Sequence, residues 1–346
     1  MEFSNTLIQW YLNNKRDLPW RKTVDPYLIW LSEIILQQTK VAQGLPYFIK
    51  FAQEFPTVFD LANADEERVL KLWQGLGYYS RARNLHTTAQ FIVQYNNSEF
   101  PKSYDGLLKL KGIGTYTAAA IASFAFNEDV SVLDGNVYRV LARYFDIETD
   151  ISSSVAKKEF TLLANTLLPK GNAAIFNQAI MEFGALQCIP KNPVCNVCIF
   201  NENCGALKNK KVELLPIKLK KTKVSVRFLN YLIFEDENKK VLLSKRTQKG
   251  IWHNLYEFPL IETNSLNIET EIVTLIKEQS FVSNKVADII KLNTEPIQHK
   301  LSHQLLNISF WKLSVKGALE NGISKEEAFK KPFPIVIHNF ILKNWF

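Results

Sequence analysis

Cysteine is scarce in this chain of 346 residues: there are four cysteines, and all of them lie within one short stretch. The chain also lacks an apolar run long enough to span a membrane, and residues 1–4 lack the basic-then-apolar pattern of a secretory leader. Low-complexity tracts and internal repeats are absent as well. These absences predict a cytoplasmic protein that makes no contact with membranes.

The four cysteines are Cys188, Cys195, Cys198 and Cys204, with six, two and five residues between successive members. Thiolates gathered on short, unequal loops are typical of a metal centre. Structural zinc sites usually pair two short Cys-x2–4-Cys knuckles, but only one pair is close here. The longer arms favour an iron–sulfur cluster. A zinc module and local disulfides are the alternatives, although nothing else in the sequence indicates export.

Composition and charge set the broad class of the protein. An apolar fraction of 47% rules out wholesale disorder, and the length predicts about two domains. The formal charge is +8 and the isoelectric point about 9.1. Such an excess favours an acidic partner, most commonly nucleic acid, although it also serves solubility.

The residue pattern divides the chain into three segments. Residues 1–204 have apolar residues at three- and four-residue steps, which predicts helices. Residues 205–223 form a linker with seven lysines, which either crosses a phosphate backbone or is a solvated tether. Residues 224–346 predict an α+β domain. In it we expect strands at 224–234, 240–244 and 307–315 and helices at 268–278 and 335–345.

A glycine-rich turn lies within the helical region. Residues 110–118 read Leu-Lys-Gly-Ile-Gly-Thr-Tyr-Thr-Ala and run into an apolar helix. Gly112 and Gly114 allow a tight turn whose backbone N–H groups, with the following helix N-terminus, suit a DNA phosphate. The full pattern is typical of a helix-hairpin-helix DNA-binding element, here at about 105–127. Asp134 follows Gly114 by twenty residues.

This hairpin, the downstream aspartate and the cysteine loop resemble the helix-hairpin-helix DNA glycosylase superfamily that carries a 4Fe–4S cluster. Two subfamilies compete, the endonuclease III-like glycosylase/lyases and the adenine DNA glycosylases. The lyases carry a nucleophilic lysine two residues after the second hairpin glycine. Tyr116 occupies that position here, and it cannot form an imine. A monofunctional hydrolase is therefore expected.

Three further segments resemble the adenine DNA glycosylases. Residues 30–41 resemble their catalytic helix, in which Glu33 would be the acid; apolar neighbours should raise the pKa of this carboxyl group. Residues 75–85 also look like that subfamily. Residues 250–259 resemble part of its Nudix-like C-terminal domain, but the acidic metal-binding helix of an active Nudix hydrolase is missing. We expect the domain to read a lesion.

The resemblance implies a role for each matched residue. Glu33 would protonate N7 of adenine, and Asp134 would stabilise the oxocarbenium-like sugar. Asp134 is also expected to cap a helix. Tyr116 and Asn136 would orient the acid and the water. The residues implied to contact the extruded adenine are Arg21, Leu36 and Gln178.

The resemblance also implies contacts with duplex DNA. Tyr78 would wedge into the stack beside 8-oxoguanine, with Gln38, Thr39 and Leu76 nearby. Ser302 and His303 would read the lesion. The family usually has an aromatic residue before this Ser-His pair, where this chain has Leu301, so lesion stacking or loop packing is expected to be weaker.

The resemblance thus implies a base excision repair enzyme that flips adenine out from opposite 8-oxoguanine or guanine. It implies one 4Fe–4S cluster on the four cysteines, whose first task is to fix the loop that carries Lys191 against the DNA backbone. We expect a monomer in the bacterial cytoplasm. A non-catalytic DNA-binding protein and a bifunctional lyase are the alternatives, opposed by the carboxylate pair and by Tyr116 respectively.

Overall fold

The chain forms two compact units in a computed structural model that describes residues 2–219, 223–265, 269–278 and 286–345. One unit comprises Met1–Asn63 and Asn84–Lys220, and the other comprises Ala64–Arg83 and Lys221–Phe346. The sequence pattern placed 64–83 with the helical region. The expected helix start at Ile268 and part of the expected linker lie outside the described residues.

The first unit is helical. Its elements are α1 (Glu2–Asn14), η1 (Pro19–Arg21), α2 (Pro26–Leu36), α3 (Val41–Glu54), α4 (Val58–Asn63), most of α6 (Ser80–Tyr95), α7 (Tyr104–Leu108), α8 (Thr115–Phe126), α9 (Gly135–Tyr144), α10 (Ser154–Leu167), α11 (Ala173–Leu186), η2 (Cys195–Val197) and α12 (Gly205–Lys208). Side-chain caps fix the starts of α2 and α10. The Asp25 carboxylate accepts from the Tyr27 N–H, and the Ser153 hydroxyl accepts from the Ala156 N–H. No helix of the described residues has the length and apolarity that crossing a membrane requires.

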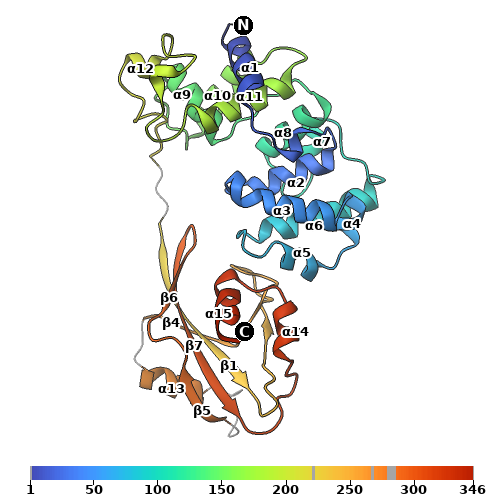
Figure 1. The fold of residues 1–346 in the computed structure, drawn as a ribbon, viewed down its shortest axis with the longest axis vertical. Helices are drawn as coiled ribbons and strands as arrows, with labels where there is room; N and C mark the ends of the chain where they lie inside the picture. The colour runs from blue at the N-terminus through green and yellow to red at the C-terminus, as the bar shows by residue number, and fades with distance from the viewer. Residues whose placement is uncertain (1, 220–222, 266–268, 279–285, 346) are drawn as a thin grey trace. The chain divides into compact units, whose positions relative to one another are not determined.

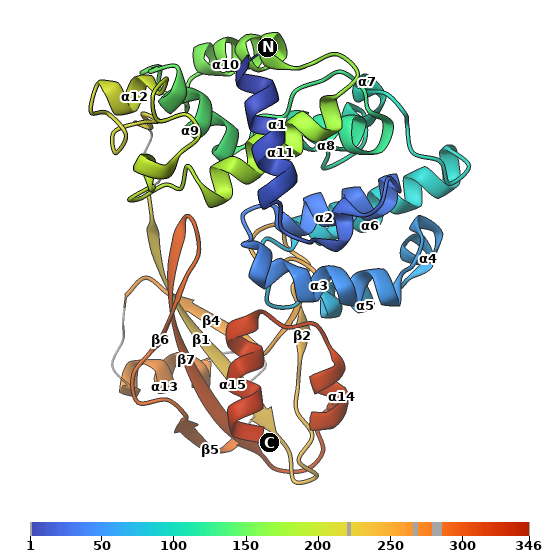
Figure 2. The ribbon, with the colours of Figure 1, turned by 45° about the horizontal axis from the view of Figure 1, so that its top comes forward.

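Helix α11 is central to this unit and packs against α1, α8 and α9 (Figure 2). Its apolar side faces the core, where Phe176, Ile180 and Phe183 are almost fully buried. Gly184 marks the closest approach of α11 to α9. A Cβ atom at Gly184 would lie 2.6 Å from the Asn136 Cβ, so the small residue is what lets the two helices meet.

The expected helix-hairpin-helix forms from α7, the turn after it and α8. Gly112 in the turn has a φ of 79°, a conformation that L side chains rarely adopt. A Cβ at Gly112 would also lie 2.7 Å from the Asn84 Cβ. Gly114 is the N-cap of α8, and both glycines are exposed. The turn is therefore accessible to a partner from outside.

The second unit is built on a mixed sheet with the strand order β4-β1-β7-β5, and β6 pairs with β7. Strands β1 and β7 are parallel, whereas the other pairs are antiparallel. A small separate ladder joins β2 to β3. The elements are α5 (Glu66–Leu72), β1 (Ser225–Glu235), β2 (Ser244–Lys245), β3 (Tyr256–Glu257), β4 (Leu260–Thr263), α13 (Glu269–Glu278), β5 (Val286–Lys291), β6 (Ile297–Lys300), β7 (Gln304–Val315), α14 (Lys325–Lys330) and α15 (Ile335–Trp345).

Helices cover both faces of this sheet (Figure 1). On one face, Leu232 and Trp311 pack with Ile272 of α13. On the other face, the Phe310 ring stacks on Phe340 of α15, with centroids 3.7 Å apart. The alternation along β1 and β7 thus buries both sides of the strands. The expected strand at 240–244 is wrong: only a bridge at Val241 and the first residue of β2 are strand-like.

The segment Ala64–Arg83 is held to the rest of the second unit by polar contacts. Glu67 of α5 accepts from Lys245 Nζ at 3.1 Å, the Tyr256 hydroxyl at 2.6 Å and Lys331 Nζ at 3.0 Å. Lys71 donates to the Phe329 carbonyl at 2.6 Å. These side chains therefore bind α5 to a surface formed by residues far away in the sequence.

Candidate functional site

A cavity of about 610 Å³ lies among α2, α8, α11 and the start of α9 in the helical unit. Its volume falls in the range usual for small-molecule sites. All seven residues expected to act on the base line it together: Arg21, Glu33, Leu36, Tyr116, Asp134, Asn136 and Gln178. Thr39, which was expected to contact the duplex, also lines it.

Glu33 is the buried acid of this cavity. Its side chain is on α2, it is only 6% exposed, and its Oε2 accepts a hydrogen bond from the Tyr116 hydroxyl at 2.7 Å. The pKa of Glu33 is raised to about 7: burial is the main cause and the nearby Asp134 adds to the rise, whereas the Tyr116 hydrogen bond and Arg21 act in the opposite direction. The expected rise in pKa is confirmed, and Glu33 can hold a proton near neutral pH.

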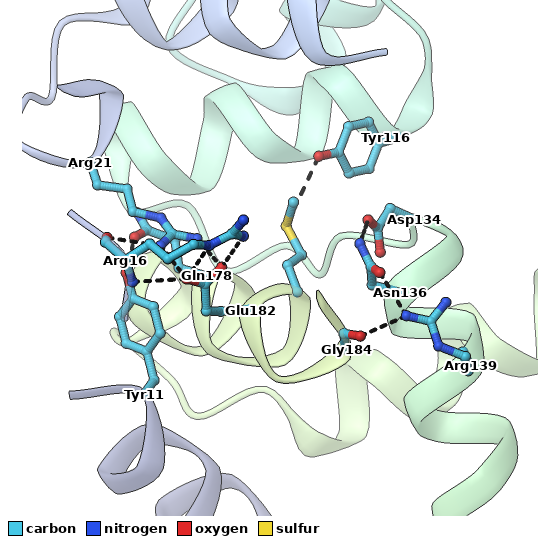
Figure 3. Close-up of polar contacts among 11 residues, drawn as sticks. Tyr11, Arg16, Arg21, Tyr116, Asp134, Asn136, Arg139, Gln178, Glu182 and Gly184 are labelled. Carbon is cyan, nitrogen blue, oxygen red and sulfur yellow. Dashed lines mark hydrogen bonds and ion pairs between the residues drawn. The ribbon is translucent and has the colours of Figure 1, made fainter. Parts of the chain in front are cut away.

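Asp134 is fixed by the start of α9. Its Oδ1 accepts from the Val137 N–H at 2.7 Å, which confirms the expected N-cap. Its Oδ2 accepts from the Asn136 amide at 2.7 Å (Figure 3). Burial raises the pKa of Asp134, and these hydrogen bonds oppose the rise. The carboxylate is therefore rigid, with both oxygens already bound.

Arg139 connects this aspartate to the cysteine loop, and the sequence pattern did not reveal it. Its guanidinium donates to Asn136 Oδ1 at 2.8 Å, to the Gly184 carbonyl at 2.7 Å and to the Cys188 carbonyl at 2.7 Å. The signal was its position one helical turn after Asn136, which places the two side chains on one face of α9. Through Arg139, the cap of α9 is tied to the end of α11.

A second cluster of polar side chains lies at the cavity wall. The sequence indicated only two of its members, Arg21 and Gln178. Figure 3 shows Tyr11, Arg16, Arg21, Gln178 and Glu182 gathered on one side of the view, and Tyr116, Asp134, Asn136, Arg139 and Gly184 on the other. Gln178 Oε1 accepts from the Tyr11 hydroxyl at 2.5 Å. Arg16 and Arg21 both bind the carboxylate of Glu182. The four-residue spacing of Gln178 and Glu182 was the signal that they share a face of α11.

The four cysteines line one small cavity of about 30 Å³ between α9 and the end of α11, together with the aromatic rings of Tyr144, Phe183 and Phe200. None is in a disulfide. Burial raises the pKa of Cys195 and Cys204, and that of Cys198 to about 11, and the neighbouring thiols add to each rise. Four converging thiolates would need a cation, and this donor set suits a metal centre.

An arginine lies beside the four thiols. Among the residues that the structure describes, no three histidine, cysteine or acidic side chains are placed as ligands of one metal ion. The Arg143 guanidinium lies 3.5 Å from Cys188 Sγ and donates to the Ile189 carbonyl at 2.7 Å. Cysteine thiolates are the usual ligands of iron–sulfur clusters, and this donor set fits such a group.

The expected lesion-reading residues meet in the second unit. Ser302 and His303 lie in the exposed turn between β6 and β7, where the Leu301 N–H donates to the Gln304 carbonyl at 2.8 Å. The Tyr78 hydroxyl hydrogen-bonds the hydroxyl of Ser302. Tyr78 has a left-handed backbone with a φ of 47°, and the Arg81 guanidinium lies over its ring. A half-exposed aromatic ring is thus held beside the turn.

The remaining expected contacts are dispersed. Gln38, just after α2, is exposed and has a φ of 58°, and Lys191 is exposed in the cysteine loop. Leu76 is almost fully buried, which is unlike a side chain in contact with DNA. The structure therefore brings together the residues expected to act on the base in one unit and the Tyr78–Ser302 pair in the other.

Family models match both parts of the chain. The model described as HhH-GPD superfamily base excision DNA repair protein matches residues 31–165. The model described as NUDIX domain matches residues 230–343. A multidomain chain with a helical helix-hairpin-helix part and a Nudix-like α+β part is thereby confirmed.

Several curated proteins are similar over most of the chain. The adenine DNA glycosylase of Buchnera aphidicola subsp. Schizaphis graminum is 36% identical, with 90% of this chain and 89% of that protein covered. The adenine DNA glycosylase of Buchnera aphidicola subsp. Baizongia pistaciae is 37% identical, with 89% and 84% covered. The rat adenine DNA glycosylase is 43% identical over 59% of this chain and 41% of its own length.

Solved structures resemble part of the chain. A thermostable thymine-DNA glycosylase matches with a TM-score of 0.55 and 29% identity, covering 60% of this chain and 95% of that one. A non-covalent endonuclease III–DNA complex matches the same shares with a TM-score of 0.53 and 23% identity. At that identity the second likeness shows the fold alone.

Proposed function

This chain belongs to the adenine DNA glycosylase family, and we propose that it hydrolyses the N-glycosidic bond of adenine mispaired with 8-oxoguanine or guanine in duplex DNA. The observation that carries the proposal is the cavity in which Glu33, with a pKa of about 7, lies with the capped Asp134. Glycoside hydrolysis uses two carboxyl groups on either side of the bond that breaks, one protonated and one ionised.

In this mechanism Glu33 is the general acid. Its protonated carboxyl group donates to N7 of the extruded adenine, so that the base departs as a neutral molecule. The Tyr116 hydroxyl, which already donates to Glu33 Oε2, fixes the orientation of the carboxyl group. Glu33 is buried at the wall of the cavity, so the adenosine must leave the base stack before it can reach Glu33.

Asp134 is the partner that remains ionised. As the glycosidic bond breaks, positive charge develops on the deoxyribose, and a fixed carboxylate stabilises it without reorganisation. The Val137 N–H and the Asn136 amide hold both oxygens of Asp134 in place. Tyr116 occupies the position at which lyases of the superfamily carry lysine, so the proposal includes hydrolysis without strand cleavage.

DNA would be held by separate elements of the chain. The exposed turn with Gly112 and Gly114 suits a backbone phosphate. The Tyr78 ring and the turn with Ser302 and His303 suit the lesion side of the mispair, because a half-exposed aromatic ring next to hydroxyl and imidazole groups offers both stacking and hydrogen bonding. We also propose that the protein acts on DNA as a monomer.

The four cysteines are proposed to hold a 4Fe–4S cluster. Their thiols line one cavity, which Arg143 and Phe200 also line. The cluster would supply rigidity to the loop that carries Lys191, while base hydrolysis transfers no electrons. Iron and acid-labile sulfide in the purified protein, at about four atoms of each per chain, are the expected analytical result. Zinc alone would contradict this part.

The test is a single-turnover assay on labelled duplexes with adenine opposite 8-oxoguanine, guanine or thymine. Half of each sample is treated with hot alkali. We expect strand breaks at the adenine only after alkali, fastest opposite 8-oxoguanine and absent opposite thymine. Breaks without alkali would indicate a lyase, and tight binding without excision would indicate a non-catalytic DNA-binding protein.

A further inference from the structure

Glu182 is a buried carboxylate that the mechanism above does not use. Its side chain is fully shielded from solvent and lies one turn after Gln178 on α11. It accepts from the Arg16 N–H at 2.9 Å, from Arg16 Nε at 2.9 Å and Nη2 at 2.5 Å, and from Arg21 Nη1 at 2.9 Å and Nη2 at 2.7 Å. Both guanidinium groups thus make two-pronged contacts with one carboxylate (Figure 3).

This ion group faces the same cavity as the proposed acid. Arg16, Arg21 and Glu182 all line it, as do Glu33 and Asp134. Arg21 also lies over the Tyr11 ring, with its guanidinium carbon 5.6 Å from the ring centroid. Two guanidinium cations and one carboxylate leave a single net positive charge on this wall. Without Glu182 the wall would carry two.

We propose that Glu182 is a positioning residue for adenine excision: it holds Arg16 and Arg21 against the cavity wall and sets the charge that this wall presents to Glu33. The inference rests on the proposed glycosylase function and extends it to the control of the acid. Glu182 acts through the two arginines and does not touch the reacting atoms.

Charged and titratable groups reach the cavity around Glu33 from every neighbouring element. Asp134 raises the pKa of Glu33, whereas Tyr116, through its hydrogen bond, and Arg21 lower it. Burial would raise the pKa of Glu182 itself, but the hydrogen bonds from the two arginines outweigh burial and lower it to about 2. Glu182 is therefore ionised at every pH at which the enzyme is folded and working. The full set of such groups lining the cavity is Arg16, Arg21, Lys40, Tyr116, Asp134, Arg139 and Glu182.

The sign of the effect follows from Coulomb's law. Replacing Glu182 by glutamine removes a negative charge, so ionised Glu33 becomes less unfavourable and its pKa falls. Excision requires protonated Glu33, and the rate therefore falls as the pH rises through this pKa. In Glu182→Gln we expect this limb of the pH–rate profile to move down by about half to one pH unit.

A second variant should move the same limb in the opposite direction. Arg16→Gln removes one cation and leaves Glu182 paired with Arg21 alone. The pKa of Glu33 should then rise, and the limb should shift to higher pH. Because the Arg16 side chain is 34% exposed, solvent screening makes this shift the smaller of the two. Loss of structure alone would lower the excision rate of both variants, but it would not move the limbs of their pH–rate profiles in opposite directions.

Two more variants distinguish the effect of the Glu182 charge from the effects of side-chain length and of a general loss of stability. Glu182→Asp keeps the charge on a shorter side chain, so it should restore the position of the limb while lowering the rate at all pH values. Glu235→Gln is the matched control, because Glu235 is a buried carboxylate in the other unit that pairs with Lys312 and Lys325. It should leave the profile of excision unchanged.

The experiment is the single-turnover excision rate for adenine opposite 8-oxoguanine, measured from about pH 5 to about pH 9. A parallel measurement needs no catalysis. Glu33→Gln is introduced into two parent proteins, the wild type and Glu182→Gln. For each parent, the free energy of unfolding is measured with and without Glu33→Gln at a series of pH values. This pH dependence reports the pKa of Glu33 with and without Glu182. Opposite limb shifts in Glu182→Gln and Arg16→Gln, matched by the unfolding data, are the expected result.

Unchanged limbs and an unchanged pKa of Glu33 in both variants would overturn the inference, even if both variants were slow. An inactive wild-type chain would instead count against the proposed function. In that case the unfolding data would still decide whether Glu182 sets the charge at Glu33. The two failures are therefore distinguishable.

Discussion

Glu33 has a carboxyl group at a place where the protein interior disfavours its charge. Its pKa is 4.5 in an unperturbed chain and about 7 in the folded protein, with burial as the main cause. A carboxyl group whose pKa rises on folding stabilises the fold least at high pH. Its contribution is fully present below its unfolded pKa and is lost as the pH rises through its folded pKa.

Glu33→Gln should therefore abolish adenine excision while stabilising the protein at alkaline pH. The shift in pKa corresponds to about 3 kcal/mol, so the variant should gain roughly 2–3 kcal/mol over wild type between about pH 5 and about pH 8.5. The measurement is chemical unfolding of both proteins at each pH. An equal difference in stability at the two pH values would mean that Glu33 is not a buried acid with a raised pKa.

At the scale of single residues, sequence motifs indicated Glu33 and Asp134, which line one cavity, but not the ion group beside them. Glu33 and Asp134 stand in local patterns that can be recognised without a structure. Arg16 and Glu182 meet across 166 positions of the sequence, and no local pattern indicates such an ion group. The four-residue spacing indicates that Glu182 shares a face of α11 with Gln178, but spacing does not show which cations bind there.

Helices α9 and α11 are the elements that set the geometry of the site. They approach so closely that a Cβ at Gly184 would lie 2.6 Å from the Asn136 Cβ and 3.1 Å from the Asn136 carbonyl oxygen. The Gly184 carbonyl also accepts a hydrogen bond from Arg139. A side chain at this position must therefore push α9 away from α11.

Gly184→Ala should lower both stability and activity. Overpacking of this kind costs about 1–3 kcal/mol, and the displacement acts directly on Asn136, which holds Asp134. We expect excision to fall by more than tenfold while binding of the lesion duplex changes little. Gly171→Ala is the comparison for a glycine distant from the site, although its φ of 70° means that it also loses stability. Full excision in Gly184→Ala would show that α9 tolerates the shift.

Helices and strands with a clear periodic pattern of apolar residues could be predicted from the sequence. Segments whose structure depends on which distant strand they pair with could not. The closing helix Ile335–Trp345 and the long strand Ser225–Glu235 agree with the expected bounds to within a residue. The apolar run at 240–244 looked equally strand-like. In the fold, Val241 makes single bridges to Glu235 and Ile323, and the chain then leaves the sheet. Which neighbour a short run meets depends on the whole fold.

The division of the whole chain into units was the least predictable feature. Residues 64–83 look helical and resemble the glycosylase region, yet they group with the C-terminal unit. The reason is a set of contacts between residues more than 170 positions apart, such as Glu67 with Lys245 and Lys331. Within that unit, the same segment carries Tyr78 to Ser302.

Glu67 is the charged centre of this association. Burial would raise its pKa, but hydrogen bonds from Tyr256, Lys331 and Lys245 outweigh burial and lower the pKa to about 2. The carboxylate is thus ionised throughout the working range of pH. Its removal would leave two lysine side chains and one phenol without their shared acceptor, and the loop with Tyr78 would be held less firmly beside Ser302.

Glu67→Gln should therefore weaken lesion preference more than chemistry. We expect the ratio of excision rates opposite 8-oxoguanine and opposite guanine to fall by about threefold to tenfold, which corresponds to roughly 1 kcal/mol. Excision opposite guanine should change little, because the cavity residues belong to the other unit. Glu99→Gln, at an exposed position of the helical unit, makes the same change in net charge and controls for stronger DNA attraction.

The outcome separates two origins of lesion preference. If the ratio falls in Glu67→Gln and not in Glu99→Gln, the contacts of α5 help to present the Tyr78–Ser302 pair to the lesion. Equal ratios in wild type and both variants would mean that the pair stays in place without Glu67. Hydrogen exchange over residues 64–83 gives the physical check, since looser binding of α5 must raise the exchange of its amides.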